Sequence, residues 1–115
     1  MKIVDIDHKI SRRELSKMAE KMFEKLVKAV VDVDREIMVV DAEMHSDQEA
    51  HLVENGSKQF NLWGINLYPE KSDDKFIEFD SVINIRPRQN NRSRGIDNPQ
   101  VQKKIKTIVN KLVEK

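Results

Sequence analysis

The sequence contains no cysteine, which excludes a disulfide scaffold, thiolate metal sites and cysteine nucleophiles. No apolar run approaches the ~20 residues that cross a bilayer, so we expect no membrane segment. The G-x-G-x-x-G, P-loop and G-x-S-x-G motifs are also missing, so dinucleotide-binding, NTPase and serine-hydrolase activities have no support. The first residues, MKIVDIDHKISRRE, lack the apolar stretch of a signal peptide. We therefore expect a cytoplasmic protein.

The 115 residues are predicted to form one domain, because no repeat, low-complexity tract or Pro/Gly-rich linker divides them. The net charge is only +1, but the charges are unevenly distributed. Residues 32–54 hold eight acidic side chains against one arginine, whereas residues 81–96 hold four arginines and no acid. The two regions either neutralise each other, within one molecule or between subunits, or present separate surfaces.

Three helices are predicted from their start signals. Two of these signals are S-x-x-E capping boxes, Ser11 with Glu14 and Ser46 with Glu49. The third is an N-cap asparagine followed by proline, which pre-sets the first helical turn. The helices are expected to begin at Ser11, Ser46 and Asn98, and the second is expected to end at Gly56.

Runs of apolar residues with a period of two predict five strands. They are expected at residues 2–6, twice within 26–44 with a turn near Asp34 and Arg35, at 58–68 and at 76–86. Pairing Val31 with Met38, and Leu67 with Ile77, gathers the apolar side chains of each hairpin on one face. The element order is β-α-β-β-α-β-β-α. We therefore predict a two-layer α+β domain whose mainly antiparallel five-stranded sheet carries three helices on one face.

The stretch IRPRQNNRSRG, residues 85–95, joins the last predicted strand to the last helix and contains four of the seven arginines. Arginine offers a rigid fork of donors that matches phosphate and carboxylate oxygens, and a helix N-terminus follows. We predict that the loop binds an anion. In the alternative, Arg86 pairs with Glu78 or Asp80 and the other arginines are solvated or bridge to the acidic segment. The predicted anion ligands are Arg86, Arg88, Arg92 and Arg94.

The last predicted strand also has a polar face. Its members are Glu78, Asp80, Asn84 and Arg86, with Asn66 and Gly64 on the neighbouring strand. Asparagine and aspartate are poor strand residues, and Gly64 leaves room in front of Asp80, so the face is a candidate for ligand contact. The alternative is an ordinary solvent-exposed face. We predict that Asn66, Asp80 and Asn84 line the approach to the anion.

Glu43, His45 and His51 are candidate metal ligands, because two histidines and a carboxylate can form a facial triad. No H-E-x-x-H signature accompanies them. Helix capping accounts for Ser46 and Glu49 in the same segment. No metal site is therefore assigned, and the three residues remain candidates only.

The sequence has only part of the charge and aromatic pattern of a nucleic-acid-binding protein. Only one loop and the lysines of the last helix are basic, and residues 32–54 are strongly acidic. The aromatic side chains that could stack on bases lie on predicted strands, with Trp63 and Phe79 on the core face. Nucleic-acid binding and pairing between subunits remain alternatives to a small anionic ligand.

The blocks AVVDVDREIMVVDAEMHSDQEAHLVENGSKQFNLWGINLYPE and FIEFDSVINIRPRQNNRSRGI resemble a family of small prokaryotic proteins of unknown function. The resemblance extends from about Ser11 to the last helix. It implies a stand-alone microbial protein of this size, and it implies no activity, substrate, cofactor or binding residue.

The sequence thus predicts a small cytoplasmic module that binds a phosphate- or carboxylate-bearing ligand through its arginine loop. In the enzymatic alternative, Glu78 and Asp80 act as an acid/base pair or hold a cation while the arginines bind a phosphate. No cofactor is assigned.

Overall fold

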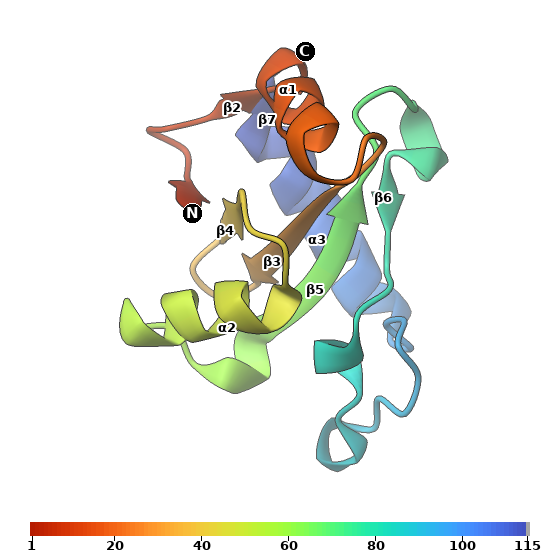
Figure 1. Cartoon of the computed structure of the whole chain (residues 1–115). Helices are drawn as coiled ribbons and strands as arrows, with labels where there is room; N and C mark the ends of the chain where they lie inside the picture. The colour runs from red at the N-terminus through yellow and green to blue at the C-terminus, as the bar shows by residue number, and fades with distance from the viewer. Residues whose placement is uncertain (115) are drawn as a thin grey trace.

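A five-stranded antiparallel sheet lies at the centre of the computed structural model, which describes residues 1–114 (Figure 1). Its strand order is β1-β4-β3-β5-β6. The strands are β1 (Lys2–Val4), β3 (Val27–Asp32), β4 (Ile37–Val40), β5 (Leu62–Leu67) and β6 (Ile77–Glu78). A separate parallel pair joins β2 (Ile10–Ser11) to β7 (Val113–Glu114). The antiparallel five-stranded sheet of the sequence analysis is confirmed.

Three helices pack on this sheet, namely α1 (Arg12–Met22), α2 (His45–Glu54) and α3 (Pro99–Leu112). Helices α1 and α3 cover the face that carries Ala29, Val31 and Ile65, and together they enclose the main hydrophobic core. Helix α2 lies on the opposite face (Figure 1), where Leu52 packs with a smaller cluster around Val30. The α+β class is confirmed, but the expectation that all three helices pack on one face is wrong for α2. Apolar side chains occupy both faces of the central strands, and each face therefore needs a helix to cover it.

The two predicted hairpin registers are confirmed, since Val31 pairs with Met38 and Leu67 pairs with Ile77. The first hairpin turns where expected because Asp32 closes it. Its Oδ1 accepts hydrogen bonds from the backbone amides of Asp34 (2.9 Å) and Arg35 (3.0 Å). An aspartate that bonds to the backbone two and three residues ahead is a frequent turn-forming device.

The predicted last strand, residues 76–86, is wrong beyond Glu78. The chain leaves the sheet there and forms short 3₁₀ turns at Val82–Asn84 and Pro87–Gln89. Ser81 begins the first turn by accepting a hydrogen bond on Oγ from the amide of Ile83. Serine and asparagine side chains that bond to nearby backbone compete with strand pairing, and here they replace it.

Two of the three predicted helix starts are confirmed. The amide of Glu14 donates to Ser11 Oγ (3.1 Å), and the amide of Gln100 donates to Asn98 Oδ1 (2.8 Å). The start at Ser46 is wrong, because α2 begins at His45 and no side chain caps it. The buried imidazole of His45 is bonded to the sheet instead, which places this residue inside the helix.

Candidate functional site

Arg86, the first predicted anion ligand, attaches the arginine loop to the start of β5. Its Nη1 donates to the carbonyl of Gln59 (2.8 Å), and its Nη2 donates to the carbonyl of Leu62. The guanidinium lies over the ring of Trp63, 4.3 Å from the ring centroid. Burial lowers the pKa of Arg86, and the charge of Glu49 opposes this effect. Arg86 therefore stabilises the fold by joining the arginine loop to the start of β5.

Two buried asparagines form the interior of the loop. Asn84 accepts a hydrogen bond from the amide of Gly64 (2.8 Å) and donates to the carbonyls of Gly64 (2.9 Å) and Arg94 (3.0 Å). Asn91 donates to the carbonyls of Asn84 (2.7 Å) and Gly95 (2.8 Å). The side-chain amide of Asn84 therefore bonds to the backbone of Gly64 in β5, in place of the backbone pairing that the predicted strand would have made.

The loop also binds a carboxylate of the same chain. Asp97 lies just past the acid-free segment, and its carboxylate accepts hydrogen bonds from Ser93 Oγ (2.7 Å) and the amide of Arg92 (3.2 Å). The side chains of Arg88 and Arg92 are exposed. Two donors of the arginine loop thus bind a carboxylate of the same chain.

Arg94 connects the loop with the polar face. Its Nε donates to Asp80 Oδ1 at 2.6 Å in a half-exposed ion pair, so the two regions meet at this point. On the same face, Glu78 Oε1 accepts from Asn66 Nδ2 (2.9 Å) and from the hydroxyl of Tyr68 (3.1 Å). Both carboxylates of this face are therefore already engaged.

Gly64 does not leave free space in front of Asp80. A Cβ built on Gly64 would lie 2.5 Å from the Cβ of Ser81 and 3.1 Å from Cγ1 of Ile83. The 3₁₀ turn after Ser81 therefore packs directly on the glycine, and no ligand group fits there.

His45 approaches the polar face from α2. Its Nε2 lies 2.7 Å from the carbonyl oxygen of Ile65. Because a carbonyl can only accept, Nε2 carries the proton and donates, and in the neutral ring Nδ1 is left as an acceptor. Burial lowers the pKa of His45, and the charges of Lys28 and Arg94 add to this effect. The bond to Ile65 and the charge of Asp80 oppose it.

The metal candidates are not brought together. Glu43 is exposed, His45 is buried against the sheet, and His51 lines a separate small cavity beside Met1 and Asp47. Among the side chains that the structure describes, those of residues 1–72 and 74–114, no three histidine, aspartate or glutamate residues are placed to hold a metal ion.

His45 should make the free energy of unfolding depend on pH. A histidine whose pKa is lowered in the native state stabilises the fold above the ordinary pKa of about 6.5, and this stability is lost as the pH falls below it. Urea unfolding of the wild type and of His45→Gln would be compared at about pH 7.5 and about pH 5. Glutamine keeps a donor for Ile65 and does not titrate. We expect the wild type to lose more stability on acidification, and equal losses would contradict the burial of a neutral imidazole.

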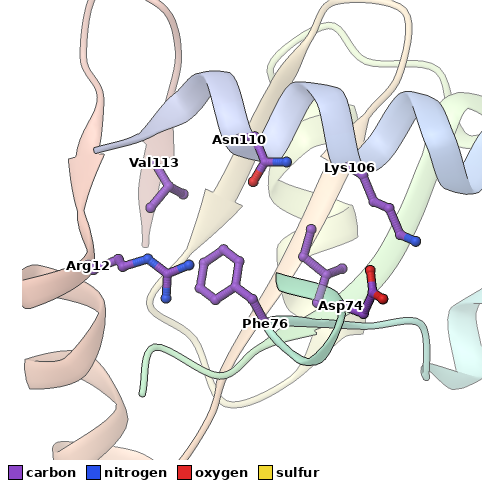
Figure 2. Close-up of a pocket in the computed structure, with 7 residues that line it drawn as sticks. Arg12, Asp74, Phe76, Lys106, Asn110 and Val113 are labelled. Carbon is purple, nitrogen blue, oxygen red and sulfur yellow. The ribbon is translucent and has the colours of Figure 1, made fainter. Parts of the chain in front are cut away.

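A cavity of about 480 Å³ opens between the start of α1, the end of α3 and the segment that leads into β6. Figure 2 shows the side chains that line it, with Arg12 beside the ring of Phe76 and Asn110 above the ring. The lining residues are Arg12, Asp74, Phe76, Ile77, Lys106, Asn110 and Val113. The volume lies within the ~300–1,000 Å³ of small-molecule sites.

Arg12 is held rigidly at this cavity. Its Nη1 donates to the carbonyls of Pro69 (3.1 Å) and Lys71 (2.9 Å). The guanidinium carbon lies 3.9 Å from the centroid of the Phe76 ring. Nε and Nη2 are the donors that remain for a ligand.

No motif in the sequence joins Arg12, Asp74, Lys106 and Asn110, because they come from three distant segments. One signal was present. Arg12 occupies the first position of α1, where the positive end of the helix dipole disfavours a cation. A residue that breaks a local rule in an otherwise regular element often has a role elsewhere.

Comparison with known proteins identifies a family but no characterised relative. No curated protein and no solved structure matches the chain. Among the described residues, no helix has the length and apolar character needed to cross a membrane. A family model described as "Protein of unknown function (DUF5674)" matches residues 4–112, and the chain therefore belongs to this family.

Proposed function

We propose that this protein binds a small organic anion, a carboxylate or a phosphate, in the cavity between α1, α3 and β6. The observation that supports the proposal is the fixed guanidinium of Arg12 at the cavity wall. An arginine that is already immobilised loses little conformational entropy when it binds a ligand, which favours affinity.

The remaining lining supports the same ligand class. Lys106 and Asn110 add a cation and an amide donor from α3, while Ile77 and Val113 provide apolar surface. With Arg12 and Lys106 against Asp74, the formal charge of the lining is +1. Ligand sites commonly combine apolar walls with a few well-placed polar groups.

The arginine loop remains an alternative anion site through its exposed arginines, Arg88 and Arg92. It is the weaker candidate because Arg86 and Arg94 already have partners within the chain. The enzymatic alternative is weaker for the same reason, since Glu78 and Asp80 are both engaged.

Asn110→Asp should weaken anion binding about tenfold, because it places a carboxylate at the cavity. Asn110 is exposed on α3, so the fold should tolerate the change. Arg12→Gln should abolish binding. Calorimetric titration with caproate and with inorganic phosphate would measure both variants.

The matched control is Gln100→Glu, which makes the same charge change on the exposed surface of α3 away from the cavity. The double variant Arg88→Ala/Arg92→Ala tests the loop. Both should bind as the wild type does. Unchanged affinity in Asn110→Asp, or loss of binding only in the loop variant, would refute the proposed site.

A further inference from the structure

We infer that the ligand of this cavity is an amino-carboxylate, a molecule with a carboxylate at one end and an ammonium group at the other. The inference rests on the proposed function and adds the class of ligand. It follows from the arrangement of opposite charges along the cavity (Figure 2).

The cavity has Arg12 at one end, and at the other end Asp74 contributes a carboxylate beside the ammonium group of Lys106 (Figure 2). Arg12 enters from α1 on one side of Phe76, and Asp74 lies on the other side of that ring in the 3₁₀ turn Asp73–Lys75 (Figure 2). A ligand that carries only negative charge would gain at Arg12 and be repelled at Asp74. A ligand with both charges gains at both positions.

The carboxylate of Asp74 is available to a ligand. Within residues 1–114 it forms no ion pair. The ammonium group of Lys106 lies 5.9 Å from the centroid of the Phe79 ring, and that of Lys71 lies 4.6 Å from the Tyr68 ring. Both lysines lie over aromatic rings, and neither forms an ion pair with Asp74.

The region between the two charges suits an uncharged spacer. Phe76 and Ile77 are buried side chains of the cavity wall, and Val113 adds apolar surface from the other side. Asn110 can donate to the carboxylate beside Arg12 or accept from the ligand. Methylene groups between the two charged ends would bury apolar surface here without leaving a polar group unpaired.

Three probes of equal chain length test the inference, namely ε-aminocaproate, caproate and hexylamine. By calorimetric titration, the wild type should bind ε-aminocaproate about fivefold more tightly than caproate, the value for one partly exposed ion pair. Hexylamine should bind more weakly than either. Asp74→Asn should reduce the affinity for ε-aminocaproate to that for caproate. Asp34→Asn, at an exposed aspartate of the β3–β4 turn, is the matched control and should change neither.

The outcomes separate the two proposals. Equal affinities of the wild type for ε-aminocaproate and caproate would overturn the amino-carboxylate inference and leave anion binding intact. An equal loss for both ligands in Asp74→Asn would also overturn it, since Asp74 would then act on the structure of the cavity. If neither ligand nor phosphate binds, or if hexylamine binds most tightly, both proposals fail.

Discussion

Replacing Gly64 with alanine is expected to destabilise the fold by about 3 kcal/mol, the upper range for overpacking a core. The new Cβ would lie 2.5 Å from the Cβ and 2.6 Å from the Oγ of Ser81. Ser81 cannot easily move away, because its amide donates to the carbonyl of Arg94 (2.9 Å) and its hydroxyl caps the following turn. The free energy of unfolding in urea would measure the effect.

Two further variants show whether the clash is the cause. Gly95→Ala is the matched control, because its Cβ would make ordinary contacts at 3.4 Å with the carbonyl of Phe79 and 3.5 Å with Ser93 Oγ. We expect it to change the stability by less than ~1 kcal/mol. Adding Ser81→Gly to Gly64→Ala should recover part of the loss in a double-mutant cycle. An alanine at Gly64 that costs no more than one at Gly95 would show that the turn does not pack on β5 in this way.

Asn84→Ala is expected to cost about 3 kcal/mol, because it removes a buried amide that makes three hydrogen bonds. The amide of Gly64 and the carbonyls of Gly64 and Arg94 would then be left without these partners. Each buried polar group without a partner costs roughly 1–3 kcal/mol, partly offset where water enters. Chemical denaturation would measure the loss of stability, and faster proteolysis at the loop would show that it has detached from β5.

The control for this variant is Asn90→Gly, which removes an exposed asparagine from the same loop. Asn90 has a positive φ of 60°, a conformation that glycine adopts without strain. It should therefore be close to neutral. Asn84→Asp should resemble Asn84→Ala, since aspartate keeps the acceptor and loses both donated bonds. If Asn84→Asp and Asn90→Gly were equally mild, the pairing of Asn84 with Gly64 would not stabilise the loop.

Residue types alone do not decide whether the arginine loop binds an external anion. An arginine-rich loop predicts anion binding through its donors, but a donor can also bind a carbonyl or a carboxylate of its own chain. Beside its local partner Gln89, Arg86 bonds to carbonyls 24 and 27 residues away, and the partner of Arg94 lies 14 residues away. No local pattern indicates which partner an arginine will have.

The sequence by itself determined those features that depend on neighbouring residues. Ser11 and Asn98 cap helices because the donors that they satisfy lie two or three residues ahead. Both hairpin registers follow from the period of two, since a slip by one residue would turn the apolar side chains of each strand to the wrong face.

Only the tertiary structure decided the features that depend on distant partners. His45 displaced the predicted cap at Ser46 through its bond to Ile65, 20 residues away. Asn84 ended the last strand by pairing with Gly64. Arg12 takes its place in the cavity wall by bonding to the carbonyls of a turn 57 and 59 residues away and by lying on Phe76. Such contacts form only when chain folding brings the partners together, and a pattern of a few consecutive residues carries no information about them.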